Sequence, residues 1–170
     1  IQLVTNVTVH FVTIKRIELA NHQTPGFDLD AFIPYRLNRA TERLSLGFSK
    51  VYKGEYSMTR PEWRVLANLG QYEMLTAKQI CEYSTQHKTK VSRAVSALEK
   101  RKWLERRQNP EDRREEWLQL TAAGMKAYRA IAREGQKHDA ALLARLGGTK
   151  ARALLTALAA LEEIQHVKPK

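Results

Sequence analysis

The stretch that decides the fold is residues 76–101, which run TAKQICEYSTQHKTKVSRAVSALEKR. Its start fits a capping box, because the Thr76 side chain can accept a hydrogen bond from the third helical N–H while Gln79 reaches back to the cap. The pattern predicts a short helix to about Ser84, a turn near residues 85–87 and a second helix to the end of the stretch. Two short helices joined by a tight turn are typical of a helix-turn-helix.

The second of these helices is predicted to have an apolar face and a polar, basic face. Its apolar residues recur at helical spacing: Val91, Ala94, Val95 and Leu98. The opposite face favours DNA contact, since an arginine such as Arg93 can form paired hydrogen bonds with guanine. The candidate DNA contacts here are Thr76, His87, Lys88, Thr89, Lys90, Ser92 and Arg93. A solvated basic helix face is the alternative interpretation.

A β-hairpin is predicted directly after this helix. Residues 103–107 and 116–120 are strand-length segments, and the loop between them contains the turn signal Asn109-Pro110. The hairpin concentrates positive charge on four arginines: Arg106, Arg107, Arg113 and Arg114. An arginine at its tip can enter a narrow minor groove, so helix and hairpin together predict a winged helix with a continuous basic footprint.

The composition fits a polyanionic partner. The chain has 170 residues, with 29 lysines and arginines against 18 acidic residues and a formal net charge of +11. More than half of that net charge falls between residues 88 and 114. Charge alone leaves nucleic acid, an anionic membrane and an acidic protein open as partners. The single Cys81 excludes an intramolecular disulfide and favours the cytoplasm, and no apolar run approaches the roughly 20 residues that cross a bilayer.

Helices are also predicted on both sides of the winged helix. We expect a long helix from an Asp30 cap, with Pro34 in its first turn and a stop at Gly54. A short helix should follow a Thr59–Glu62 capping box and end at Gly70.

Two further helices are expected after the hairpin. One should run from Thr121 to about Leu146, and a terminal helix should follow Thr149. The terminal helix carries an apolar stripe about as wide as a partner helix: Leu154, Leu158, Leu161 and Ile164.

The sequence therefore predicts a mainly α protein, a winged helix-turn-helix with a β-hairpin wing and long N- and C-terminal helices that form a dimerisation region. Residues 1–27 are an N-terminal arm or leader, and residues 58–120 are the DNA-binding domain. Residues 28–57 and 121–170 make the helical dimerisation region. The stripe on the terminal helix is assigned to a homodimer contact, with packing on its own subunit as the alternative.

The residues that carry the strongest resemblance lie in the recognition helix and wing. Residues 88–95, Leu98-Glu99, residues 112–114 and residues 118–121 resemble the signature of the MarR family, and the resemblance spans about residues 30–165. It implies a homodimeric transcription regulator, a repressor, bound to a palindromic double-stranded operator.

The resemblance also implies roles for the wing residues. Arg114 would enter the minor groove, Asp112 would orient it, and Arg113 would contact phosphate. His87 stands where relatives often have an aspartate. Both a helix cap and a base or phosphate contact therefore stay open for His87.

Relatives commonly release DNA when a small aromatic or carboxylate ligand binds between the dimer helices and the DNA-binding domain. The residues that would line such a site here are Tyr35, Arg39, Trp63 and Tyr128. Aromatic rings with an arginine suit an aromatic or anionic ligand, although Trp63 and Tyr128 at helical spacing also fit a plain core.

Other functions find less support in the sequence. Redox sensing through Cys81 is one alternative, although a buried structural cysteine is favoured. The chain lacks catalytic motifs and its histidines lack metal-ligand spacing, so no enzyme activity, no metal and no other cofactor is expected. An architectural DNA-binding module or a protein-interaction winged helix remains a further alternative.

Overall fold

The computed structural model describes residues 26–110 and 115–164. The chain divides into two units, Ile1–Thr41 and Glu42–Lys170, and each is treated by itself. Helix α1 (Ile33–Gly54) begins in the first unit and ends in the second. The predicted arm at residues 1–27 lies outside the described residues except for its last two positions.

The first unit corrects one predicted cap. Helix α1 begins at Ile33, so the expectation that Asp30 caps it is wrong. The Asp30 carboxylate instead accepts a hydrogen bond from Arg39 Nη1 at 2.6 Å. Pro34 lies in the first helical turn, as predicted, where its missing N–H leaves no intrahelical hydrogen bond unmade.

The second unit carries the remaining elements in the order that the sequence predicts, with one addition. In chain order they are α2 (Arg60–Tyr72), β1 (Met74–Thr76), α3 (Ala77–Ser84), α4 (Lys88–Lys100), β2 (Leu104–Gln108), β3 (Glu116–Leu120), α5 (Ala122–Leu146) and α6 (Gly148–Ile164). The addition is β1, whose three residues are too few to show an alternating pattern. It converts the expected hairpin into a three-stranded antiparallel sheet of order β1-β3-β2.

Both predicted capping boxes are confirmed. The Glu62 and Gln79 backbone N–H groups donate to Thr59 Oγ1 and Thr76 Oγ1 at 3.4 and 3.2 Å, and both reciprocal bonds are present. Helix α2 continues two residues past its predicted end at Gly70 and stops at Glu73, which has a φ of 63°.

The core of the second unit lies under α2, α4 and the sheet. Helix α2 contributes Val65, Leu66 and Leu69, which are fully buried. The predicted apolar face of α4 is confirmed, with Val91 and Leu98 at most 1% exposed. The remaining fully or nearly buried side chains of the cluster come from the neighbouring elements: Tyr52, Met58, Leu75, Ile80, Leu104, Leu118 and Ile131. Burial of one face of α4 leaves its other face exposed.

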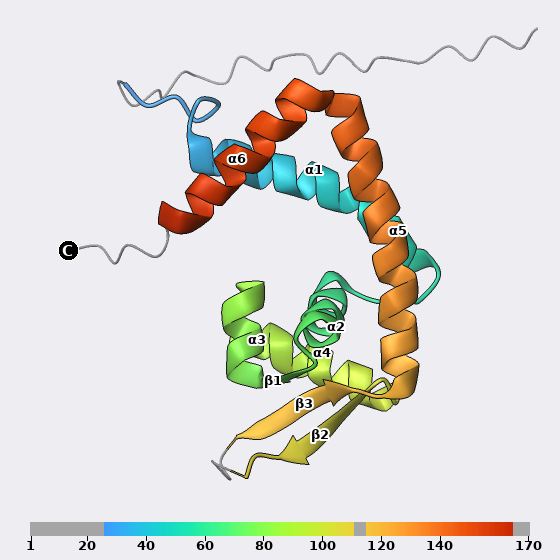
Figure 1. Ribbon diagram of the computed structural model, residues 1–170. Helices are drawn as coiled ribbons and strands as arrows, with labels where there is room; N and C mark the ends of the chain where they lie inside the picture. The colour runs from blue at the N-terminus through green and yellow to red at the C-terminus, as the bar shows by residue number, and fades with distance from the viewer. Residues whose placement is uncertain (1–25, 111–114, 165–170) are drawn as a thin grey trace, which may run out of the picture. The chain divides into compact units, whose positions relative to one another are not determined.

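The hairpin of β2 and β3 extends beside α4, and α5 departs directly from the end of β3 (Figure 1). The chain leaves α5 at Gly147, which has a φ of 78° that suits glycine, and then forms α6. Among the described residues no helix combines the length and apolar character that a bilayer crossing needs.

Candidate functional site

The exposed face of α4 presents the predicted DNA contacts to solvent. Lys88, Thr89, Lys90, Ser92 and Arg93 are all exposed. Within the part of the chain that the structure describes, none of the three cations among them forms an ion pair. Their charges are therefore free for an external anion.

His87 is the N-cap of α4. Its Nδ1 accepts a hydrogen bond from the Thr89 backbone N–H at 3.3 Å. A nitrogen that accepts carries no proton, so Nε2 remains as the ring nitrogen able to donate outward. His87 therefore caps α4, which was one of the two roles that the sequence allowed. A base or phosphate contact through Nε2 is compatible with this cap.

Thr76 has a different place from the other candidates. It is 5% exposed, and its hydroxyl accepts from the Gln79 backbone N–H while its own N–H donates to Gln79 Oε1 at 2.8 Å. These bonds give Thr76 the role of capping α3. Its side chain is not part of the exposed face of α4.

The wing is tied to α4 by Arg106. Its guanidinium donates to both carboxylate oxygens of Glu99 at 2.7 and 3.1 Å and to Glu116 at 2.6 Å. The two carboxylates hold the pKa of Arg106 above its usual range, with the hydrogen bonds to Glu99 as the larger cause. The sequence-based prediction placed Arg106 in the DNA footprint. In the structure its charge is paired with the carboxylates of Glu99 and Glu116.

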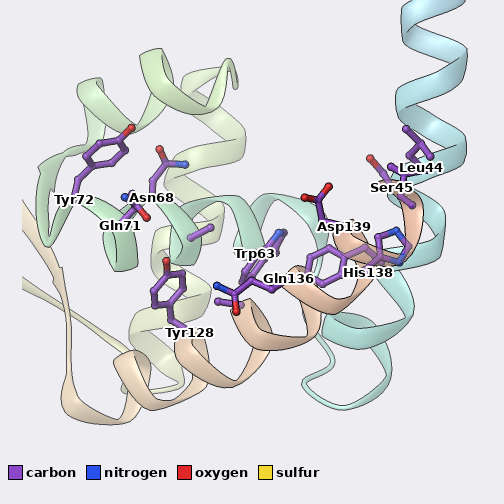
Figure 2. A pocket seen from close by; sticks show the side chains of 15 residues that line it. Leu44, Ser45, Trp63, Asn68, Gln71, Tyr72, Tyr128, Gln136, His138 and Asp139 are labelled. Carbon is purple, nitrogen blue, oxygen red and sulfur yellow. The ribbon is translucent and has the colours of Figure 1, made fainter. Parts of the chain in front are cut away.

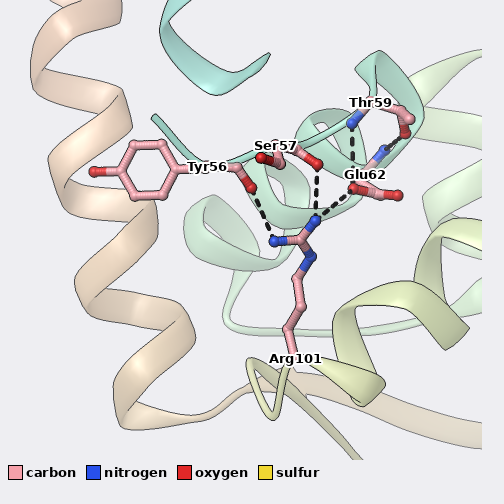
Figure 3. Close-up of polar contacts among 5 residues, drawn as sticks. All are labelled: Tyr56, Ser57, Thr59, Glu62 and Arg101. Carbon is pink, nitrogen blue, oxygen red and sulfur yellow. Dashed lines mark hydrogen bonds and ion pairs between the residues drawn. The ribbon is translucent and has the colours of Figure 1, made fainter. Parts of the chain in front are cut away.

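Arg101 anchors the far end of α4 in the same way (Figure 3). Its Nη1 and Nη2 atoms donate to the Tyr56 and Ser57 carbonyl oxygens, both at 2.8 Å, and Nη2 lies 3.7 Å from Glu62 Oε2. Glu62 also closes the capping box at the start of α2. Arg101 therefore links the end of α4 to the loop between α1 and α2, a role that no local sequence pattern revealed.

The tip of the wing is described only in part. Arg107 is exposed on β2 and pairs with Glu105 at 3.2 Å. The predicted minor-groove arginine Arg114, the orienting Asp112 and the phosphate contact Arg113 lie outside the described residues. Their roles stay predictions.

A pocket of about 680 Å³ lies among α1, α2 and α5 of the second unit (Figure 2). Four aromatic rings line it: Phe48, Trp63, Tyr72 and Tyr128. Two of the predicted ligand contacts, Trp63 and Tyr128, are thus brought together. Tyr35 and Arg39 belong to the first unit and are not lining residues; the Arg39 guanidinium lies 5.5 Å from the Tyr35 ring centroid.

Close helix packing shapes this pocket. A Cβ atom at Gly70 of α2 would overlap the Tyr128 ring of α5, so glycine lets the ring lie against the helix backbone. On the other side, Arg60 at the start of α2 donates to both carboxylate oxygens of Glu42 on α1 at 2.6 and 3.0 Å. These hydrogen bonds lower the pKa of the Glu42 carboxyl.

The family model described as the MarR family matches residues 56–115 of the chain. That segment contains all of α2, the whole helix-turn-helix and the first strand of the wing. The match gives this segment its assignment: residues 56–115 are similar to the MarR family.

Relatives and solved structures agree with this assignment. An HTH-type transcriptional regulator of Bacillus subtilis strain 168, YwoH, is 33% identical over 89 residues, which cover 52% of this chain and 64% of that protein. A MarR family regulator of Silicibacter pomeroyi DSS-3, SPO1453, superposes with a TM-score of 0.73 at 21% identity, over 82% of this chain and 98% of that one. NadR in complex with 4-hydroxyphenylacetate gives 0.72 at 24%, over 85% and 99%. These two structures establish the MarR fold of the chain.

Two further features of this chain bear on the predicted redox and homodimer functions. Cys81 is half-buried and packs against the core. Its exposure is thus intermediate between that of the buried structural cysteine that the sequence favoured and that of a freely exposed thiol. In the predicted stripe of α6, Leu158, Leu161 and Ile164 are 40%, 37% and 65% exposed, whereas Leu154 is half-buried. A single chain thus leaves most of the stripe open to solvent.

Proposed function

We propose that this chain is a member of the MarR family, a homodimeric transcription regulator and a repressor, that binds a palindromic double-stranded DNA site. The observation that carries the proposal is the exposed face of α4, whose cations Lys88, Lys90 and Arg93 form no ion pair within the described residues. Unpaired cations on a recognition helix suit the phosphates and base edges of a major groove.

The residues divide by role. Arg93 contacts a base, because its guanidinium can match the two acceptors of guanine. Lys88, Thr89, Lys90 and Ser92 contact phosphates or neighbouring bases, and His87 donates through Nε2. By resemblance to the family, Arg114 enters the minor groove with Asp112 as its orienting acid and Arg113 on phosphate.

The homodimer forms through the terminal helices. Leu155, Leu158, Leu161 and Ile164 of α6 are large apolar side chains left exposed by a single chain. Exposed apolar groups that recur along one helix favour burial against a partner. A two-fold dimer also sets two recognition helices one helical turn of DNA apart, as a palindrome requires.

A small aromatic ligand modulates DNA binding through the pocket of α1, α2 and α5. The relative NadR is seen with 4-hydroxyphenylacetate, which supports a ligand-binding role for this fold. The aromatic lining around Trp63 and Tyr128 supports an aromatic ligand here. The ligand releases DNA if it favours a dimer whose recognition helices no longer match the operator spacing.

The test is selection of the full chain against a random duplex library at physiological salt, followed by titration of the enriched site against scrambled DNA. An inverted repeat with half-sites about one turn apart, bound roughly 10³-fold tighter than scrambled DNA, is the expected result. Binding without enrichment would contradict a sequence-specific regulator and favour an architectural DNA-binding protein. The Arg93→Ala variant should bind the enriched site more weakly and relax the base preference at one position of each half-site.

A further inference from the structure

The charge of the pocket departs from what a carboxylate ligand needs. Among the described residues that line it, none is a lysine or an arginine, and Asp139 is the one acidic side chain. We propose that this pocket selects a neutral or cationic aromatic molecule that donates hydrogen bonds, and that it discriminates against aromatic carboxylates. The inference rests on the proposed ligand-binding role of the pocket and names the class of ligand.

Asn68 supplies a fixed hydrogen-bond acceptor. Its Nδ2 donates to the Arg64 carbonyl oxygen at 2.8 Å. Because a carbonyl oxygen only accepts, the amide orientation is settled, and Oδ1 is left to accept a hydrogen bond from a ligand, beside the second N–H of Nδ2. No other group within the described residues bonds to Oδ1, so a ligand N–H or O–H suits it.

Asp139 supplies a second acceptor, and it is charged. It is exposed on α5 and forms no ion pair with any residue that the structure describes. Figure 2 shows Asn68 with Gln71 and Tyr72 at one end of the pocket, and His138 with Leu44 and Ser45 at the other. A ligand that spans the pocket therefore finds acceptors at separate positions, and Asp139 attracts a cation and repels an anion.

The aromatic walls have the same preference. Phe48 and Trp63 pack edge to face with ring centroids 5.4 Å apart, and both rings line the pocket. The negative faces of aromatic rings attract an ammonium or a similar cation. A carboxylate that leaves water for this wall meets no lysine or arginine among the described lining residues, so only neutral donors such as the Gln71 and Gln136 amides offset its lost hydration.

Among the described lining residues, His138 is the one whose side chain belongs to a basic residue type. Its ring packs against Phe48 with a centroid distance of 5.9 Å. Gly47 leaves it room, since a Cβ there would lie 2.8 Å from His138 Cε1. Next to His138 in the chain stands Asp139, whose charge opposes an anion that approaches the ring. A contribution of a basic side chain to carboxylate binding would have to come from His138, and a His138→Gln variant measures it.

The experiment compares three probes that share one phenol ring: tyramine, 4-hydroxyphenylacetamide and 4-hydroxyphenylacetate, which carry an amine, an amide and a carboxylate. Each is titrated into the full chain by calorimetry near neutral pH. We expect the amine and the amide to bind at least about tenfold tighter than the carboxylate, a difference of about 1.4 kcal/mol. Equal or tighter binding of the carboxylate overturns the proposal, and so does a failure of all three probes to bind.

Variants assign the preference to the pocket. Asp139→Asn should reduce tyramine affinity about tenfold and leave the amide unchanged. Glu134→Gln is the matched control, because Glu134 lies on the same helix, pairs with Lys137 and does not line the pocket. An equal loss in both variants would contradict a role for Asp139.

The same protein, tested on its selected DNA site, separates this inference from the proposed function. An amine that binds the pocket and leaves the DNA complex intact supports the ligand class and contradicts ligand-controlled DNA binding. A carboxylate that releases DNA while the amine does not overturns the ligand class and supports the regulator.

Discussion

The two ends of α4 carry similar numbers of basic residues and use them in different ways. At the N-terminal end Lys88, Lys90 and Arg93 are exposed and unpaired within the described residues. At the C-terminal end Arg101 is bonded to the loop before α2 and Glu99 is bonded to Arg106 of the wing, while Lys100 stays exposed. The N-terminal end is left free to contact DNA, and the C-terminal end holds the helix in place.

This difference shows what net charge leaves out. A basic residue attracts DNA only if its charge is not already paired, and a paired residue contributes by fixing geometry instead. Helix α4 is therefore rigidly attached where it meets α2 and the wing and open where it would meet the groove. The comparison predicts stability effects at one end and DNA effects at the other.

The largest expected effect concerns the buried apolar face of α4, which runs along the whole helix. Leu98 is fully buried, so Leu98→Ala should lower the free energy of unfolding by about 2–5 kcal/mol, through lost burial and a cavity. Urea denaturation measures the loss. Ser96→Ala, at an exposed position on the same helix, should change stability by less than about 0.5 kcal/mol. A small effect of Leu98→Ala would mean that α4 is not packed as described.

Arg93→Ala should affect DNA and not stability. Loss of a paired hydrogen bond to guanine should cost about 1–3 kcal/mol of specific binding and relax the base preference at one position of each half-site. Titration of operator and scrambled duplexes measures both quantities. Equal losses on the two duplexes would instead assign Arg93 to a phosphate.

The sequence predicted most of the fold because the signals were local. The Thr59 and Thr76 capping boxes each lie within four residues, and the apolar spacing of α4 within about two turns. It missed β1, because three residues that pair with β3 have no pattern of their own. The predicted cap at Asp30 was wrong. The Asp30 carboxylate accepts a hydrogen bond from Arg39 instead, and the residue types typical of helix caps do not predict such a side-chain pair.

The candidate DNA-contacting residues could be predicted from the sequence where one helix carries them. The exposed residues of α4 follow from its period, as the contrast between buried Val91 and exposed Arg93 shows. The partners of Arg101 lie 44 and 45 positions away in the chain, so its anchoring role needed the structure. The pocket was predicted only in part: the sequence named Trp63 and Tyr128, whereas Asn68 and Asp139 needed the structure.

Arg101→Met tests the anchored end. The variant keeps an apolar stem but loses the bonds to the Tyr56 and Ser57 carbonyl oxygens, so stability should fall by about 1–2 kcal/mol, a value reduced for partial exposure. Thermal and urea denaturation check this. Lys100→Met removes an exposed neighbouring cation and is the matched control. If both variants were equally stable, the contacts of Arg101 would contribute nothing.

Glu99→Gln weakens the contact between the C-terminal end of α4 and Arg106 of the wing. The Arg106 guanidinium loses its two-point partner, and stability should fall by about 0.5–1 kcal/mol because the pair is partly exposed. Arg106 keeps its pair with Glu116, but with one carboxylate fewer beside it the guanidinium attracts phosphate more strongly, so binding to random duplex should strengthen and grow more salt-dependent. Glu105→Gln, which affects the pair with Arg107, is the control. Unchanged DNA binding would mean that Arg106 cannot reach phosphate.

Lys88→Ala has the smallest expected effect and separates charge from recognition at the free end. If Lys88 neutralises one phosphate, its loss should reduce the slope of log affinity against log salt by about 0.9 in magnitude for each contact, with the base preference unchanged. Titrations at several salt concentrations measure the slope. Lys126→Ala on α5, exposed and remote from α4 in the chain, should leave it unaltered. A changed base preference would place Lys88 on a base and extend the specificity-determining part of α4 by more than a turn beyond Arg93.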